Sequence, residues 1–371
     1  MKRLRVVVKV GSSSLVTPGG ELDRSRLGLV VAETGALRRQ GAEVLLVSSG
    51  AVAAGLGTLG LRPGAVTLAE KQAAAAIGQG RLVDAYRGMF VPLGIEVAQV
   101  LLSRAELEHP RRVGHLSRAL AALLHHDVLP VVNENDTVAS DEAKIGDNDT
   151  LAALLAVVVG ADLLVLLTDI DGFYDADPRR TPRAKRISVV ERWTPELAAS
   201  AGQPGTGMGT GGMRTKLSAA RIATHAGIDT VIARSEPGVL LRIVAGDGAG
   251  TLFRAHPQPG PRREVWLRYG ARPRGRLILD DGAVAAVEGR QASLLLPGIT
   301  DFRGAFLAGD VVELATAGDR VIARGTALIG AHDIMRWLSQ AEKVPRRAVR
   351  VVQHRTMVMA EGEPGDGLEQ G

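Results

Sequence analysis

The residues best suited to chemistry lie in short polar stretches that follow apolar runs. The first is VVVKVGSSS, residues 6–14, in which an apolar β-branched run delivers Lys9 into a glycine-serine turn. Such a run predicts a buried strand, and the turn after it offers backbone amides beside one compact positive charge. This combination suits an anionic ligand such as a phosphate. Taken alone, the stretch also fits an exposed lysine after an ordinary first strand.

A second stretch with a lysine at its end is GTGMGTGGMRTK, residues 205–216. Glycine frees backbone amides to surround a phosphate at the start of a helix, and Lys216 would lie in the first turn of that helix, facing the same pocket. The spacing matches neither a Walker A motif nor a dinucleotide-binding fingerprint. Phosphate binding and a plain flexible loop therefore both remain open for this stretch.

Amides and carboxylates are concentrated between one predicted strand and the next predicted helix. They are Asn133, Glu134, Asn135, Asp136, Asp141, Asp147, Asn148 and Asp149. Asn148 or Asp149 could serve only as the cap of the helix, but this does not account for the whole set. We expect the set to recognise a small zwitterion, with carboxylates toward an ammonium and amides toward a carboxylate.

Two shorter polar stretches complete the candidates. Ser48, Ser49 and Gly50 follow the apolar run at residues 44–47, and TDIDG, residues 168–172, follows the run at 163–167. The second can be read in two ways. It is either an acidic turn or a nucleotide-binding edge, with Asp169 or Asp171 near a metal–phosphate complex.

A regular alternation of predicted strands and helices positions these stretches. Beyond the first strand, strands are predicted at 44–47, 97–102, 128–132, 163–167 and 230–233, and helices at 22–40, 68–89, 117–125, 150–159 and 213–226. This alternation predicts an α/β fold, a three-layer sandwich whose mostly parallel central sheet is covered on both faces. In such sheets ligands bind beyond the carboxyl ends of the strands, which is where the polar stretches fall.

The pattern changes after residue 253, where a proline- and glycine-containing segment precedes short strands and tight turns. Strands are predicted at 276–279, 311–314 and 321–324, which indicates a second, compact β-rich domain. We therefore expect a catalytic domain over residues 1–255, a linker over 256–263, the β-rich domain over 264–352 and a disordered tail over 360–371.

The composition excludes several classes of function. The chain has no cysteine, which excludes disulfides, thiolate catalysis and cysteine-based metal sites. It shows no signal-peptide pattern, and charged residues or glycines interrupt every apolar segment of transmembrane length. We expect a cytoplasmic location and no membrane association. Positive charge favours RNA binding, but the charges are mixed, aromatic residues make up only 3% of the chain and no base-stacking motif is present, so RNA binding is possible but not favoured.

Seven motifs, taken in order, resemble the amino acid kinase family, and within it the branch that phosphorylates glutamate. They are VVKVGSSS, SSGAVAAG, KQAAAAIGQ, NENDTV, IGDND, LTDIDGFYDADPR and GTGGMRTKLSAA. The segments RGRLILDDGAVAAV, SLLLPGI, GAFLAGDVVEL and VIARGTALI are similar to the PUA domain that bacterial members commonly carry. The motif set is specific, although any single motif would not be.

The resemblance implies ATP-dependent phosphorylation of the side-chain carboxylate of L-glutamate, the first step of proline synthesis. Lys9 and Lys216 would neutralise the transferring phosphoryl group, and Asp149 would hold both lysines. Glutamate would contact Ser49, Gly50, Asp136, Lys144, Asp147 and Asn148. ATP would contact Lys9, Gly11, Ser12, Thr168, Asp169, Thr210, Gly211, Gly212, Met213, Arg214, Thr215 and Lys216.

Mg²⁺ would accompany ATP, and no protein ligand to the metal is expected. The resemblance also implies feedback inhibition by proline and a homo-oligomer, either a dimer or a tetramer. A carboxylate is already a nucleophile at neutral pH, so the reaction needs no general base and none of the histidines needs a catalytic role. Two alternatives stay open, namely a family member with another substrate and an RNA-binding protein acting through the PUA domain.

Overall fold

The computed structural model describes residues 3–17, 19–62, 66–138, 147–176, 178, 181–194, 197, 212–289, 292–339 and 349–360. The chain divides into two compact units. The first unit combines Met1–Glu106 with Gly114–Gly260, and the second combines Leu107–Val113 with Pro261–Gly371. The predicted tail after residue 360 lies outside the described residues.

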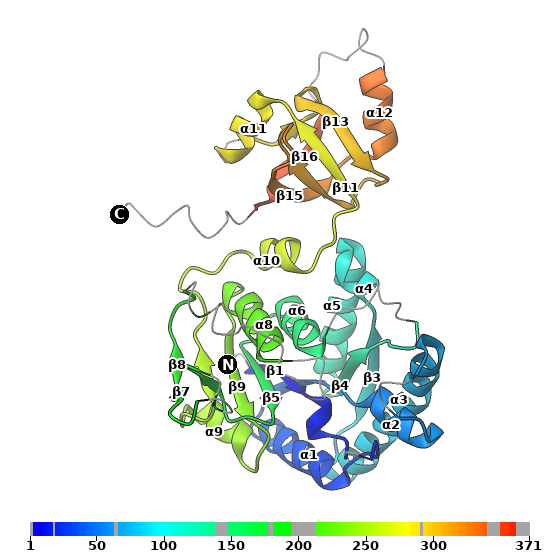
Figure 1. Cartoon of the computed structure of the whole chain (residues 1–371), viewed down its shortest axis with the longest axis vertical. Helices are drawn as coiled ribbons and strands as arrows, with labels where there is room; N and C mark the ends of the chain where they lie inside the picture. Colours follow the sequence, from blue (N-terminus) through cyan, green and yellow to red (C-terminus); the bar gives the residue numbers. More distant parts are fainter. Residues whose placement is uncertain are drawn as a thin grey trace. The chain divides into compact units, whose positions relative to one another are not determined.

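An eight-stranded, mostly parallel sheet forms the centre of the first unit (Figure 1). In spatial order its strands are β3 (Val97–Leu102), β4 (Leu129–Glu134), β2 (Glu43–Val47), β1 (Arg5–Val10), β5 (Leu163–Thr168), β9 (Asp229–Arg234), β10 (Thr251–Phe253) and β8 (Val189–Val190). Only the β9–β10 pair is antiparallel among the pairings of this sheet in the described residues. A separate two-stranded pair joins β6 (Phe173–Tyr174) and β7 (Arg186–Ile187).

Strand β1 lies in the interior of this sheet, between β2 and β5, and is parallel to both. Its valines are fully buried, as expected for a β-branched run covered on both faces. In the register of the sheet, Lys9 lies beside Val47 of β2 and Leu166 of β5. Strand β2, the next strand in the sequence, pairs with one side of β1, and the later strand β5 pairs with the other side. The strand order therefore reverses between β1 and β5. Such points are the usual ligand crevices of α/β sheets.

Helices cover both faces of the sheet, which confirms the predicted fold class (Figure 1). Their bounds are α1 (Arg24–Arg39), α2 (Ala51–Leu59), α3 (Leu68–Phe90), α4 (Arg104–Glu108), α5 (Pro110–His125), α6 (Asn148–Val159), α8 (Met213–His225) and α9 (Val239–Ala245). Helices α6 and α8 pack together on one face, and α1, α3 and α9 lie on the other. Short 3₁₀ turns, η1 (Ser12–Ser14) and η2 (Val91–Leu93), follow β1 and α3.

Most predicted helices begin where a local signal places them. The carboxylate of Asp23 caps α1 by accepting hydrogen bonds from the amides of Ser25 and Arg26, in agreement with the predicted helix at residues 22–40. Helix α5 differs from its prediction, since it starts at Pro110 and not at residue 117. Proline is well tolerated in the first turn of a helix, so Pro110 is compatible with this earlier start.

Helices α2 and α3 approach each other unusually closely, because two glycines lie at their contact. A Cβ atom added to Gly78 would lie 1.8 Å from the carbonyl oxygen of Ala51, and one added to Gly55 would lie 1.8 Å from that of Ala74. No side chain fits at either position without separating the helices. The small-residue motifs SSGAVAAG and KQAAAAIGQ therefore form one tightly packed helix pair directly after β2.

The second unit is built on a six-stranded sheet with the order β12-β16-β15-β14-β11-β13. Its elements are α10 (Arg262–Tyr269), β11 (Gly275–Leu279), α11 (Asp281–Glu288), β12 (Leu294–Leu295), η3 (Leu296–Gly298), β13 (Ile299–Gly304), β14 (Val311–Ala315), β15 (Val321–Ala327), α12 (Ala331–Ser339) and β16 (Arg350–Met359). Buried Leu277, Val312, Leu314 and Val352 belong to its core. Helix α10 begins inside the predicted linker, and β16 continues beyond the predicted domain end.

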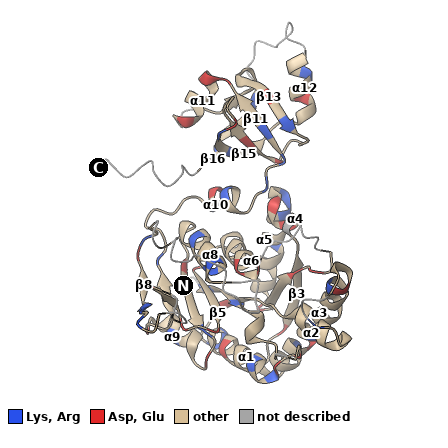
Figure 2. Cartoon of the chain, in the orientation of Figure 1, with Lys and Arg blue, Asp and Glu red and all other residues tan. Residues whose placement is uncertain are grey.

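Basic and acidic side chains occur together in both units (Figure 2). In the second unit, Arg276 pairs with Glu313 at 2.7 Å and with Asp319 at 2.8 Å, and Arg303 also reaches Asp319. Several arginines of this unit are therefore neutralised within it. Across the part of the chain that the structure describes, no helix is both long and apolar enough to span a membrane.

Candidate active site

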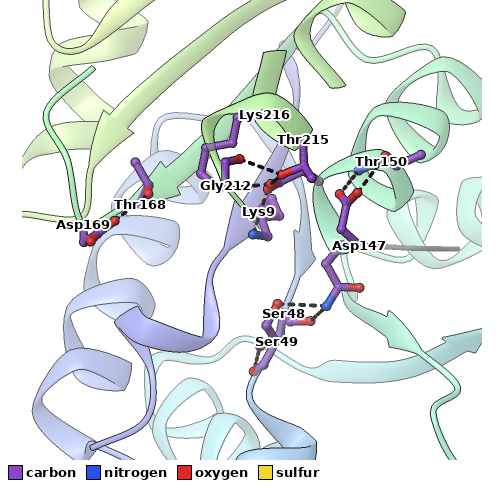
Figure 3. A network of polar contacts seen from close by, with 12 residues as sticks. Lys9, Ser48, Ser49, Asp147, Thr150, Thr168, Asp169, Gly212, Thr215 and Lys216 are labelled. Atoms are coloured by element: carbon purple, nitrogen blue, oxygen red, sulfur yellow. Dashed lines mark hydrogen bonds and ion pairs between the residues drawn. The ribbon is translucent and has the colours of Figure 1, made fainter. Parts of the chain in front are cut away.

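Two lysines from distant parts of the sequence meet at one aspartate (Figure 3). Lys9 comes from the end of β1, Lys216 from the first turns of α8, and Asp149 from the start of α6. The Lys9 Nζ lies 2.8 Å from Oδ1 of Asp149, and the Lys216 Nζ lies 3.1 Å from its Oδ2. One carboxylate thus holds two ammonium groups, one on each oxygen.

All three charged groups are buried. Lys9 and Lys216 are 6% and 5% exposed, and Asp149 is fully inaccessible to solvent. Burial alone would raise the pKa of Asp149, but the charges of Lys9 and Lys216 outweigh it and lower this pKa. For Lys9, burial lowers the pKa of its ammonium, with Asp149 opposing the change. The cluster has two positive charges against one negative charge, so it can attract an anion.

Thr215 ties the helix that carries Lys216 to the same carboxylate. Its hydroxyl lies 2.8 Å from Oδ2 of Asp149 and 2.9 Å from the carbonyl oxygen of Gly212, both of which can accept its proton. A hydrogen bond to Asp149 also contributes to the lowering of the Asp149 pKa. The predicted ATP contact at Thr215 therefore has a partner within the protein.

On one side of the cluster, Asn148 joins the start of α6 to the end of β2. Its Nδ2 lies 3.1 Å from the carbonyl oxygen of Ser48 and 2.8 Å from Oγ of Ser49, both of which can accept a hydrogen bond from it. Gly50, which caps α2, has a φ of 97°, a conformation that favours glycine. A side chain at Gly50 would also approach Val16 to 2.9 Å. The structure therefore brings together Ser49, Gly50 and Asn148 of the predicted glutamate-binding set.

Helix α6 is capped by Asp147, and not by Asn148 or Asp149. The Asp147 carboxylate accepts hydrogen bonds from the amide and the hydroxyl of Thr150, at 2.7 and 3.2 Å. The sequence-based prediction that Asn148 or Asp149 caps this helix is therefore wrong. Burial raises the pKa of Asp147, and the nearby charge of Asp149 adds to that rise, while the bonds from Thr150 oppose it.

Asp136 follows β4 at the same edge of the sheet and is half-buried. On the opposite side of the cluster, Thr168 ends β5 and its hydroxyl donates to Asp169 at 3.0 Å. Gly11 and Ser12 form the turn directly after Lys9. Figure 3 shows Thr168 and Asp169 to one side of Lys9 and Ser48 and Ser49 to another.

The Gly-rich stretch is described only from Gly212 onward. Gly212 caps α8, Met213 is half-buried and Arg214 is exposed. Lys144, Thr210 and Gly211 lie outside the described residues, so their predicted roles in binding stay predictions.

Two residues that no site prediction named, Gln79 and Tyr86, contribute to this edge of the sheet together with Asn133, which belongs to the predicted set of amides and carboxylates. Asn133, at the end of β4, donates from Nδ2 to Oε1 of Gln79 on α3 at 2.9 Å and accepts from Nδ2 of Asn148 at 3.0 Å. The Tyr86 hydroxyl lies 3.0 Å from Oγ of Ser48. Gln79 lies in the motif KQAAAAIGQ, which carried the family resemblance without any assigned role.

The arrangement suits transfer of a charged group without proton transfer. Positive charges lie between two sets of polar groups, one on the β2 and β4 side and one on the β5 side. Stabilisation of an anionic transition state needs such preorganised charges and donors. Within the described residues, no group of three histidine, aspartate or glutamate side chains could hold a metal ion.

Comparisons with known proteins identify the family of this chain and support its fold. The sequence model of the PUA domain matches residues 275–360. Glutamate 5-kinases from Picosynechococcus sp. and Pelobacter propionicus are 48% and 43% identical to this chain, over 89% and 91% of its length and 89% and 90% of theirs. The solved carbamate kinase from Giardia lamblia bound to AMP-PNP, 17% identical, matches with a TM-score of 0.50 over 68% of this chain and 99% of its own, which supports the fold alone. Since the sequence model of the amino acid kinase family matches residues 4–234, the chain belongs to the amino acid kinase family.

Proposed function

We propose that this chain transfers the γ-phosphoryl group of ATP to the side-chain carboxylate of L-glutamate, forming L-glutamyl 5-phosphate and ADP. The observation that carries the proposal is the buried cluster in which Asp149 holds Lys9 and Lys216 at 2.8 and 3.1 Å. The similarity of nearly the whole chain to glutamate 5-kinases supports the choice of substrate. The reaction is the first step of proline synthesis, and its product is an activated acid.

The reaction forms one bond between a carboxylate oxygen and phosphorus and breaks the bond between phosphorus and the oxygen of ADP. A glutamate carboxylate is ionised at neutral pH, so no proton has to be removed before attack. Catalysis then depends on alignment of the two reactants and on cancellation of charge on the transferring group. Lys9 and Lys216 supply that charge, and Asp149 fixes their separation.

The two substrates approach the cluster from opposite sides. L-Glutamate occupies the side formed by the ends of β2 and β4 and the start of α6, where Ser49, Asp136 and Asn148 lie. ATP occupies the side formed by β5 and the start of α8, where Thr168, Asp169 and the residues before Lys216 lie. The strand order supports this division, because β2 and β4 lie on one side of β1 and β5 on the other.

When bound with ATP, Mg²⁺ neutralises phosphate charge and orients the phosphates. Both oxygens of Asp149 lie against ammonium groups, so this carboxylate is not placed as a metal ligand. The described residues thus fit an ion held mainly by the phosphates and water, as Mg²⁺ commonly is.

Regulation and assembly complete the proposal. Proline inhibits by competing at the glutamate side, because the substrate and the end product share an amino acid core. The chain acts as a dimer or tetramer in the cytoplasm. Proline inhibition predicts an increase in the apparent KM for glutamate, and a KM that proline leaves unchanged would remove this part of the proposal.

The substrate assignment is tested with a panel of acceptors and a coupled assay of ADP release. L-Glutamate, N-acetylglutamate, aspartate, carbamate and UMP are compared at equal concentration with Mg²⁺ and ATP. We expect kcat/KM for L-glutamate to exceed that for every other acceptor by at least about 100-fold, roughly the discrimination that a few buried polar contacts supply. Preference for another acceptor would overturn the assignment but leave the kinase chemistry intact.

A further inference from the structure

Three side-chain amides from three elements form a continuous chain at the glutamate side of the site. The Asn133 Nδ2 on β4 donates to Oε1 of Gln79 on α3 at 2.9 Å, and the Asn148 Nδ2 on α6 donates to Oδ1 of Asn133 at 3.0 Å. Gln79 and Asn133 are 7% and 1% exposed. A buried amide chain of this kind has a direction, because each NH₂ must face the oxygen of the next group.

Two backbone groups fix that direction, and a backbone group cannot exchange its donor and acceptor roles. The amide N–H of Glu134 donates to Oδ1 of Asn133 at 2.9 Å, so the oxygen of this asparagine must face Glu134. The carbonyl oxygen of Ser48 accepts from Nδ2 of Asn148 at 3.1 Å, so the nitrogen of Asn148 must face Ser48. The NH₂ of Asn133 therefore donates to Gln79, and the side-chain oxygen of Gln79 must face Asn133 to accept it.

The two ends of the chain are consequently defined. Asn148 presents its oxygen at one end and Gln79 its NH₂ at the other, and each of these atoms is buried without a hydrogen-bond partner among the described residues. An unpaired oxygen at the substrate end calls for a donor on the ligand. Of the polar groups of L-glutamate, only the α-ammonium is a donor. This reverses the sequence-based expectation that amides face the substrate carboxylate.

Gln79 is held rigidly in the position that this chain requires. Its neighbour Gly78 packs directly on the backbone of Ala51, which allows no side chain between α3 and α2. Helix α2 begins two residues after Ser49, which itself lies 2.8 Å from Nδ2 of Asn148. The contact between the helices therefore sets the distance between Gln79 and the substrate side of the site.

We propose that Gln79 is a positioning residue for substrate specificity. By accepting from Nδ2 of Asn133, Gln79 holds this asparagine in place beside Asn148. The carbonyl oxygen of Ser48 turns the oxygen of Asn148 toward the ligand, where it accepts a hydrogen bond from the α-ammonium of the amino acid substrate. Gln79 itself does not touch the substrate. The inference rests on the proposed function, because it takes Asn148 to lie in the glutamate site.

The test compares Gln79→Met with the parent enzyme on two acceptors, L-glutamate and glutarate. Glutarate keeps both carboxylates and lacks only the ammonium group. Methionine has a similar length and no strong hydrogen-bonding group, so it interrupts the amide chain at its buried end. We expect kcat/KM for L-glutamate to fall by about 10–100-fold, mainly through KM with kcat within about threefold, because hydrogen bonds to charged groups are among the stronger ones. For glutarate, kcat/KM should change by less than about threefold.

The decisive quantity is the ratio of the two kcat/KM values, since any loss of folded enzyme lowers both equally. A ratio that stays at the parental value would assign Gln79 a structural role only and overturn the proposal. Gln40→Met makes the same chemical change at an exposed glutamine at the end of α1, and it should leave both values unchanged. If Gln79→Met does not fold, Gln79→Ala is measured in its place with the same expectation.

Gln79→Glu supplies an independent check. A carboxylate keeps an oxygen toward Nδ2 of Asn133 and removes only the NH₂ that has no partner, so the preference for L-glutamate over glutarate should persist within about threefold. If Gln79→Glu loses the preference for L-glutamate over glutarate as fully as Gln79→Met does, the proposed direction of the amide chain is contradicted. Failure of the proposed function itself looks different, because the parent enzyme would then not phosphorylate L-glutamate at all.

Discussion

Replacement of Asp149 by asparagine removes the one negative charge between two buried ammonium groups while keeping the shape of the side chain. Asp149 is fully buried, and the side chains of Lys9 and Lys216 are each 7% exposed, so solvent screens little of the interaction. Removing one partner of a buried ion pair costs about 3–5 kcal/mol. If this free energy is lost from the stabilisation of the transition state, kcat decreases by roughly 10²–10⁴-fold.

The assay is ADP release at saturating ATP and L-glutamate, combined with a thermal unfolding scan of the same preparation. The KM for L-glutamate should stay within a few-fold, because the Asp149 carboxylate contacts Lys9, Lys216 and Thr215 and acts through the lysines. Asp23→Asn is the matched control, since Asp23 caps α1 away from the cluster and asparagine caps a helix equally well. A kcat for Asp149→Asn within tenfold of the parent, at an unchanged Tm, would refute the role given to this charge.

Two further predictions concern packing and pH. Gly78→Ala should destabilise the fold by about 1–3 kcal/mol in a denaturant titration, because its Cβ would lie 1.8 Å from the Ala51 carbonyl oxygen. Gly80→Ala, in the same helix with open space around it, should instead stabilise the fold by about 0.5–1 kcal/mol, and equal effects of the two would contradict the packing. Burial lowers the pKa of Lys9, and its ammonium is charged only below that pKa. We therefore expect kcat to fall as the pH rises, before the ordinary lysine range near about 10.4 is reached, and a profile that stays flat up to that range would argue against this.

The layers of the fold and the polar edge of the sheet were predictable from the sequence because the signals for both are local. Apolar runs of five or six residues define β1, β2 and β5, and each ends in polar residues, so the edge of the sheet that carries them follows from parallel pairing. That Lys9 and Lys216 meet at Asp149 was implied by the resemblance to the amino acid kinase family and not by these local signals. The structure places them on the two oxygens of Asp149.

The amide chain was not predictable in the same way. Gln79 lies in the middle of an alanine-rich helix, where a glutamine usually indicates an exposed face, and only the tertiary contact of α3 with α2 and β4 buries it. The cap of α6 also depended on a detail of geometry, since three adjacent residues, Asp147, Asn148 and Asp149, can all cap a helix. The start of α10 was missed because Pro261 and its neighbours resemble a linker, although proline also suits the start of a helix.

The central claim is that the buried lysine pair promotes transfer of phosphate to a carboxylate of L-glutamate. An acyl phosphate reacts with hydroxylamine, whereas a phosphate ester or amide does not react under the same mild conditions. The most direct measurement is therefore to incubate the full chain with ATP, Mg²⁺, L-glutamate and hydroxylamine and to quantify glutamyl hydroxamate by mass spectrometry beside ADP. We predict one hydroxamate per ADP, with the hydroxamate on the side-chain carboxyl carbon. Release of ADP without glutamyl hydroxamate would contradict the account.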